Sequence, residues 1–91
     1  GATGMLFVFD QVDYHGIWMK DMLFPLDLIW IDENLVVIGI EKGIRPDTYP
    51  RTFRPPLPAK YLIETTERYT ETFGINVGDE VRLPRRLEEK M

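Results

Sequence analysis

One stretch of the sequence decides the fold: Asp27-Leu28-Ile29-Trp30-Ile31-Asp32-Glu33-Asn34-Leu35-Val36-Val37-Ile38-Gly39-Ile40. Apolar residues, most of them β-branched or aromatic, fill its two halves and predict strands over 27–32 and 35–40. Asp32-Glu33-Asn34 separates the two strands with turn chemistry, because Asp accepts hydrogen bonds from the backbone ahead and Asn tolerates the left-handed conformation. The stretch therefore predicts a β-hairpin.

Other segments of the chain add short strands to this hairpin. Apolar residues with strand propensity occupy 5–9, 17–20, 59–64 and 80–83. We expect the strand at 5–9 to be buried, because every residue in it is apolar. Short strands joined by tight turns predict a mainly-β fold, a small antiparallel β-barrel or jelly-roll-like domain. With 44% hydrophobic residues and no linker, residues 1–84 are predicted to form a single domain and 85–91 a charged C-terminal tail.

One short α-helix is expected at about residues 66–73. The threonine pair at 65–66 can cap its N-terminus, and Gly74 follows as a C-terminal stop. Tyr69 and Phe73 are four positions apart, so they share a helix face that we expect to pack on the sheet.

The composition excludes several classes of site. Cysteine is absent, so disulfides, thiolate nucleophiles and cysteine-based metal sites are excluded. The single histidine, His15, lacks a second metal ligand at a recognised spacing, and we expect no metal and no cofactor. No apolar run is long enough to cross a bilayer and no leader sequence opens the chain, so we expect no membrane association and leave the compartment open.

Charge is distributed unevenly along the chain. The net charge of −4 argues against nucleic acid as a partner. Between positions 42 and 60, however, five basic residues and one acid, Asp47, give a local charge of +4. The basic residues are Lys42, Arg45, Arg51, Arg54 and Lys60. Within this region, residues 43–58 contain five prolines and no apolar periodicity, which predicts a long irregular loop of a kind that often carries function.

Several blocks of the sequence, taken in order, resemble the family known as Domain of Unknown Function 192. The blocks are Gly4 to Phe9, Trp18-Met19-Lys20, Pro25-Leu26-Asp27, Ile31-Asp32, Pro56, Pro58 to Glu64 and Gly74 to Val81. The resemblance implies a compact β-barrel or jelly-roll-like domain of bacteria and archaea with no established activity. Family members usually carry an earlier Gly-Leu-Met block, which has no counterpart here, and often Asn-Thr where this chain has Asp21-Met22. A missing strand would expose a sheet edge to another chain.

Trp18-Met19-Lys20 is the most distinctive group of candidate binding residues. In a binding site, Trp18 would form one wall of a pocket and Lys20 would face an anionic group. In a structural role, Trp18 and Met19 would instead fill the core while Lys20 points to water, because large apolar residues of small domains are usually buried.

The loop arginines Arg45, Arg51 and Arg54 also have two interpretations. Guanidinium groups interleaved with Tyr49 and Phe53 suit the recognition of phosphate, carboxylate or sugar acids. Alternatively, the loop is a stiff solvated crossover whose arginines pair with the acidic remainder of the chain.

Asp27 and Glu64 are the candidate catalytic residues, together with Lys20. If all three faced one pocket, burial could raise the carboxylate pKa values into a range useful for acid–base chemistry. If not, each carboxylate accepts backbone hydrogen bonds or pairs with a basic residue, as structural carboxylates do.

Three hypotheses for function follow from these residues. The leading one is a non-enzymatic binding or accessory module, with a groove between residues 18–20 and the loop 43–58 for a small anionic ligand or a partner peptide. The second is an acid–base enzyme acting on a carbohydrate-like substrate. The third is a structural or interaction domain with an exposed sheet edge. The oligomeric state is left open, and we favour a non-enzymatic role.

Overall fold

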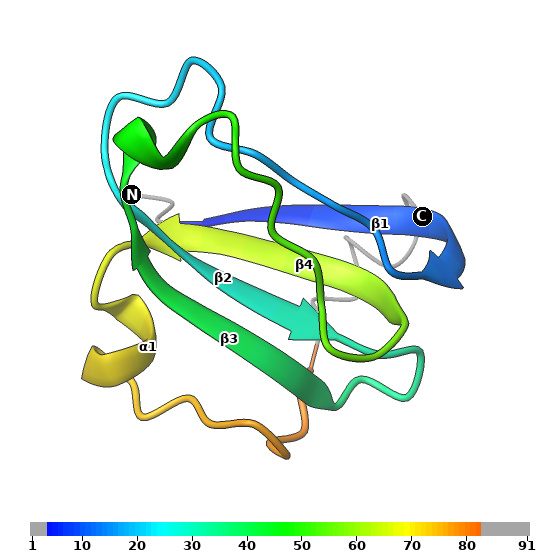
Figure 1. Ribbon diagram of the computed structural model, residues 1–91. Coiled ribbons are helices and arrows are strands. Elements are labelled where there is room, and N and C mark those ends of the chain that lie inside the picture. Colours follow the sequence, from blue (N-terminus) through cyan, green and yellow to red (C-terminus); the bar gives the residue numbers. More distant parts are fainter. Residues whose placement is uncertain (1–3, 83–91) are drawn as a thin grey trace.

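Four strands form one antiparallel sheet in the computed structural model, which describes residues 4–82 (Figure 1). The strands are β1 (Gly4–Asp13), β2 (Leu26–Ile31), β3 (Val37–Ile44) and β4 (Ala59–Thr66), and their order in the sheet is β1-β4-β2-β3. The prediction of a mainly-β fold is confirmed. The sheet is open rather than closed into a barrel, so that β1 and β3 form its two edges within the described part of the chain.

The predicted hairpin is formed by β2 and β3. The Oδ1 atom of Asp32 accepts hydrogen bonds from the backbone N–H groups of Asn34 and Val36, at 2.9 and 3.0 Å. The residue in the left-handed conformation is Leu35, with φ of 63°, and not Asn34. The turn therefore depends on the side chain of Asp32, as its chemistry predicted, but the strained position falls one residue later.

Strand β1 is confirmed as a strand but not as a buried one. It extends from Gly4 to Asp13 and pairs only with β4 among the described strands. Because one side of an edge strand has no neighbour, the apolar side chains of Met5, Phe7 and Val12 remain exposed. An apolar run alone could not distinguish an edge strand from a central one; β2, by contrast, is buried at every position.

Each face of the sheet carries its own apolar cluster. One face, called here the Trp30 face, holds a buried cluster made of Met19, Leu26, Leu28, Trp30, Ile44, Phe53, Ala59 and Leu62. The opposite face, called here the Ile29 face, holds the buried residues Ile29, Ile31 and Val37, against which Ile75 and Val81 pack. Burial of each large side chain in these clusters stabilises the fold by about 1.5–3 kcal/mol.

The two long irregular segments, 14–25 and 45–58, lie next to each other above the sheet (Figure 1). They are joined by an isolated antiparallel bridge between Ile17 and Phe53, with N–H to carbonyl distances of 2.9 and 2.7 Å. Phe53 is buried in the Trp30-face cluster, so the proline-rich loop contributes to the core. Its regular structure is one 3-10 turn, η1 (Pro46–Thr48).

The predicted helix is a single turn, α1 (Tyr69–Thr72), and Gly74 follows with φ of 61°, as expected for a helix stop. Its N-cap is Arg68, in the left-handed conformation and with no side-chain cap, so the expected threonine cap is wrong. The rings of Tyr69 and Phe73 are in contact, with centroids 4.6 Å apart, but Phe73 is largely exposed rather than packed on the sheet.

The last predicted strand, 80–83, is reduced to one bridge between Val36 and Glu80, and its final residue lies outside the described residues. The expected charged tail, 85–91, also lies outside them. No helix among residues 4–82 has the length and apolar character needed to cross a membrane.

Candidate functional site

The two candidate carboxylates lie on opposite faces of the sheet. In the pairing of β2 with β4, Asp27 is opposite Thr65, and Leu28 is opposite Glu64. Directly opposed residues share a face and successive residues alternate between faces. Glu64 therefore shares the Trp30 face with Leu28, whereas Asp27 lies on the Ile29 face. The condition for joint acid–base chemistry, convergence on one cavity, is not met.

Asp27 is fully buried and is saturated with hydrogen bonds. Its Oδ2 atom accepts from the hydroxyl and the backbone N–H of Thr70, at 2.7 and 3.0 Å, and its Oδ1 atom accepts from the N–H of Gly43 at 2.9 Å. Burial alone would raise the pKa of Asp27, but the hydrogen bonds from Thr70 and Gly43 outweigh it and hold the pKa below its ordinary value of 3.8. Asp27 thus ties β3 and α1 to β2.

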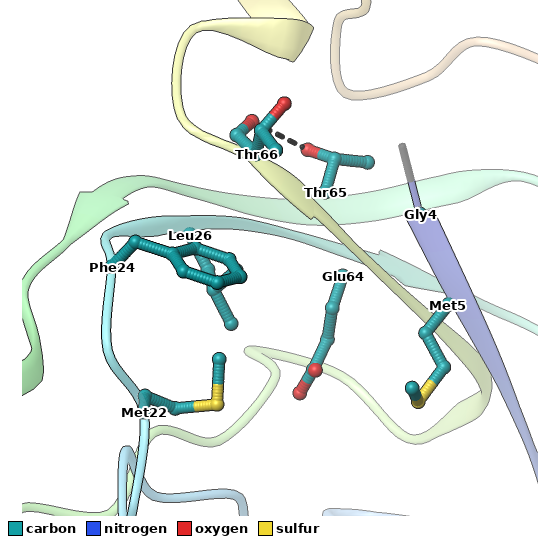
Figure 2. Close-up of a pocket in the computed structure, with 8 residues that line it drawn as sticks. All are labelled: Gly4, Met5, Met22, Phe24, Leu26, Glu64, Thr65 and Thr66. Carbon is teal, nitrogen blue, oxygen red and sulfur yellow. Dashed lines mark hydrogen bonds between the residues drawn. The ribbon is translucent and has the colours of Figure 1, made fainter. Parts of the chain in front are cut away.

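Glu64 occupies a different environment, an apolar pocket at the end of the sheet where β1 and β2 begin (Figure 2). The pocket has a volume of about 210 Å³. It is lined by Gly4, Met5, Met22, Phe24, Leu26, Glu64, Thr65 and Thr66. Figure 2 shows the Glu64 carboxyl group extending between the two methionine side chains, below the ring of Phe24. Glu64 is the one ionisable residue of this lining.

The Glu64 carboxylate has no hydrogen-bond or ion-pair partner among residues 4–82. Its cross-strand neighbours, Met5 on β1 and Leu28 on β2, are both apolar. Partial burial without compensating donors raises the pKa of Glu64 above its ordinary value of 4.5. The pocket therefore combines apolar walls with one uncompensated acceptor group.

Trp18, Met19 and Lys20 are separated by the fold. Met19 is buried in the Trp30-face cluster, which confirms its structural interpretation. Trp18 is 48% exposed, so its side chain does not fill the core. Its ring lies against that of Tyr49, with centroids 5.0 Å apart, and the Nζ atom of Lys20 lies 5.8 Å from its centroid. Trp18, Lys20 and Tyr49 are called here the aromatic–basic surface.

The three loop arginines differ in how they are engaged. Arg51 lies with its guanidinium group 4.6 Å from the ring centroid of Phe53 and has no carboxylate partner among the described residues. Arg54 donates a hydrogen bond of 2.7 Å to the backbone carbonyl of Tyr14, and Arg45 forms an exposed ion pair of 3.4 Å with Asp47. Of the three, Arg51 has the guanidinium group with fewest polar contacts.

Lys20 lies over Trp18 and is not part of the Glu64 pocket. His15 is half-buried, and its ring is stacked on that of Phe9 with the centroids 3.9 Å apart. Within residues 4–82, no three acidic or histidine side chains gather as they would around a metal ion.

Sequence reasoning missed most of the Glu64 pocket. Met5, Met22 and Phe24 belong to separate segments, and only the tertiary fold brings them together. The one available signal was the Met22 to Leu26 apolar run around Pro25, which is too short for a membrane span and is interrupted for a strand. Two of its five residues remain exposed in the folded chain, Leu23 at 90% and Phe24 at 51%.

Together, these elements define a small β domain built on one open four-stranded sheet, with an apolar pocket at one end of the sheet. A model of the family DUF192, described as "Uncharacterized ACR, COG1430", matches residues 1–83. The chain belongs to this family. Among curated proteins, none matches the chain.

Two solved structures are similar to this fold. One is a protein of unknown function from Novosphingobium aromaticivorans, with a TM-score of 0.82 and 25% identity over 88% of this chain and 56% of that one. The other is a putative transcription regulator from Sinorhizobium meliloti, with a TM-score of 0.79 and 26% identity over 85% of this chain and 59% of that one. This chain therefore spans a little more than half the length of either protein.

Proposed function

We propose that this chain is a non-enzymatic binding module that takes a small anionic ligand on the aromatic–basic surface. The observation that carries the proposal is the exposed ring of Trp18, held against Tyr49 with the Lys20 ammonium group nearby. Exposed aromatic rings offer a flat apolar wall, and the adjacent cations favour phosphate or carboxylate groups. Arg51, which lies on the neighbouring loop, supplies the second cation.

The position of the proline-rich loop supports this proposal. The bridge between Ile17 and Phe53 brings the loop beside the segment that carries Trp18. Arg51 and Arg54, which flank Phe53 in the sequence, therefore lie near the segment that carries Trp18. An anion approaching this surface meets a favourable field in a protein whose net charge is otherwise negative.

The acid–base enzyme hypothesis has less support. It requires Asp27, Glu64 and Lys20 to face one cavity, but the two carboxylates point to opposite faces and Lys20 lies over Trp18. The hydrogen bonds of Asp27 also leave it no free lone pair facing solvent, since the residue is fully buried. We therefore retain the non-enzymatic role.

Intrinsic tryptophan fluorescence tests the proposal directly. Trp18 is exposed and Trp30 is buried, so a ligand on the aromatic–basic surface changes the emission of Trp18 alone. Titration with inorganic phosphate, glucuronate and galacturonate is expected to give a saturable change that the Trp18→Phe variant lacks. Lys20→Gln should weaken binding about tenfold, a loss of about 1.4 kcal/mol. Lys42→Gln, which removes the same charge at an exposed position outside the surface, serves as the matched control.

Two results would count against this proposal. One is a fluorescence response that is identical in the Lys20→Gln and Lys42→Gln variants, because the Lys20 charge would then have no local role. The other is saturable binding of duplex DNA with no response to small anions, which would favour the regulatory role named for the Sinorhizobium meliloti protein.

A second candidate function is the binding of a partner peptide at the free edge of β1. The exposed apolar side chains of Met5, Phe7 and Val12 on this edge strand favour it. An added strand would use the backbone groups of β1 that have no partner among residues 4–82 and would cover these side chains. Sedimentation velocity of the 91-residue chain tests self-association at this edge. If the chain is a monomer at every concentration, the partner at this edge is not a second copy of the chain.

A further inference from the structure

We propose that the Glu64 pocket is a second binding site, separate from the aromatic–basic surface, for a small amphiphilic amine: an alkyl or aryl group that carries a protonated ammonium. The pocket is separate from the proposed anion site, because the two share no residue. It rests on the shape of the pocket, the nature of its walls and the lack of a partner for its carboxylate.

The walls of the pocket suit the apolar part of such a ligand. Met5 and Met22 flank the Glu64 carboxyl group, and the ring of Phe24 lies above it (Figure 2). Methionine side chains are flexible and polarisable, so they adapt to apolar groups of different shape. At about 210 Å³, the pocket is smaller than the roughly 300–1,000 Å³ typical of sites for drug-sized molecules, which restricts the ligand to a short chain or a single ring.

The exposure of the rim indicates that the pocket is not simply part of the core. Met5 is 59% exposed and Phe24 is 51% exposed. Leu23, which precedes Phe24 in the sequence, is almost entirely exposed to solvent. Exposed apolar side chains at the rim of a pocket favour a site of interaction.

The charge of the ligand follows from Glu64. Among residues 4–82, each element around the carboxylate contributes apolar neighbours: Met5 from β1, Leu28 from β2, and Met22 and Phe24 from the preceding loop. Within the described part of the chain, no cationic side chain lines the pocket. A ligand ammonium group would supply the missing partner for the carboxylate and would gain a cation–π contact with Phe24. An anionic ligand would be repelled by the same group.

The proposal is tested by NMR titration of the 91-residue chain with ¹³C-labelled methionine methyl groups at pH 7. The ligands are hexylammonium, 1-hexanol and hexanoate, which share one apolar chain and differ in charge. Hexylammonium is expected to shift the methyl signals of Met5 and Met22 and to bind about tenfold more tightly than 1-hexanol, with hexanoate weakest. Met19, which is buried in the core and does not line the pocket, is the internal control and should shift less than either.

Variants of two glutamates separate the pocket from general electrostatics. Glu64→Gln keeps the shape of the side chain and should reduce hexylammonium affinity about tenfold, to the level of 1-hexanol. Glu41 lies opposite Leu28 on the other side of β2, in the same cross-strand row as Glu64, but it is exposed and outside the pocket. Glu41→Gln therefore removes the same charge and should leave hexylammonium binding unchanged. Trp18→Phe should also leave it unchanged, so failure here and failure of the anion site are distinguishable.

Several outcomes would overturn the proposal. Equal affinity for hexylammonium and 1-hexanol would show that the carboxylate has no role in recognition. An equal loss in the Glu41→Gln and Glu64→Gln variants would show that only net charge matters. A response of Met5 and Met22 to an extended apolar peptide but not to hexylammonium would assign the pocket to a partner strand at the β1 edge.

Discussion

Asp27 and Glu64 are carboxylates on neighbouring strands, one position apart in register, yet their surroundings are opposite. Asp27 lies on the Ile29 face of the sheet and is fully buried. It accepts two hydrogen bonds from Thr70 and one from Gly43. Glu64 lies on the Trp30 face in an apolar pocket, and its carboxylate has no hydrogen-bond or ion-pair partner among residues 4–82. Burial is common to both residues, but only one of them receives donors that compensate for it.

The difference explains why burial of a carboxylate does not by itself identify a functional residue. Where donors saturate the group, the charged form is stabilised, its pKa falls and the residue holds the fold together. Where donors are missing, the pKa rises and the group remains available to a ligand. Asp27 therefore has a structural role, and the missing donors around Glu64 support the binding role that we propose for it.

The largest expected effect is the loss of stability in the Asp27→Asn variant. The amide cannot accept all three hydrogen bonds, and its NH₂ group would face N–H donors in a buried site. We expect the free energy of unfolding to fall by about 3 kcal/mol, measured by urea denaturation at pH 7. Because the folded pKa of Asp27 is lowered, its stabilisation is present above the unfolded pKa and is lost as the pH falls through the folded pKa. The difference in the free energy of unfolding between the wild type and the Asp27→Asn variant should therefore become smaller below pH 3.8.

A destabilisation of less than about 1 kcal/mol in Asp27→Asn would contradict this interpretation, because that is the cost of one ordinary hydrogen bond. Asp32→Asn is a useful control. Its carboxylate also accepts two backbone N–H bonds, but it does so in an exposed turn, where water can replace them. We expect a smaller loss there.

Removal of one donor to Asp27 should have an intermediate effect. Thr70→Val deletes the hydroxyl that donates at 2.7 Å and keeps the shape of the side chain. The carboxylate would retain the N–H groups of Thr70 and Gly43, so we expect a loss of about 1 to 2 kcal/mol in urea denaturation. Thr70→Ser, which keeps the hydroxyl, should lose less than Thr70→Val. The reverse order would indicate that the methyl group, and not the hydrogen bond, is important.

The smallest effect, and one of opposite sign, is expected for Glu64→Gln. The pKa of Glu64 in the folded protein is raised above its ordinary value of 4.5. Its contribution to the free energy of unfolding is therefore most favourable below pH 4.5 and is lost as the pH rises through the folded-state pKa. At pH 7 the variant should be slightly more stable than the wild type, by less than about 1 kcal/mol, and this advantage should vanish near pH 3. Parallel urea denaturation at both pH values measures it, and a loss of stability at pH 7 would mean that the carboxylate has a stabilising partner.

The sequence predicted the regular part of the fold because local rules govern it. The hairpin of β2 and β3 follows from two apolar runs around Asp32, and the stop at Gly74 follows from its backbone freedom. The N-terminus of α1 could not be predicted in this way. The backbone N–H of Thr70 is bonded by Asp27, which is 43 residues away in the sequence, in place of a local threonine cap.

The candidate sites were predicted less well, for a related reason. Trp18 and Met19 are adjacent in the sequence and equally apolar, yet one is exposed beside Tyr49 and the other is buried. Only the pairing of Ile17 with Phe53 determines which of them faces inward. In the same way, the opposite orientations of Asp27 and Glu64 depend on the register of β2 and β4, which no local pattern specifies.

The difference between the two carboxylates is that donors hold Asp27 charged, whereas Glu64 lies in an apolar pocket with no compensating partner among residues 4–82. It is tested most directly by following the side-chain carboxyl ¹³C signals of Asp27 and Glu64 through an acid titration of the intact chain. We predict that Glu64 titrates above 4.5 and Asp27 below 3.8, and that saturating hexylammonium lowers only the Glu64 value. A Glu64 pKa below 4.5 without ligand, or an Asp27 pKa above 3.8, would contradict the account.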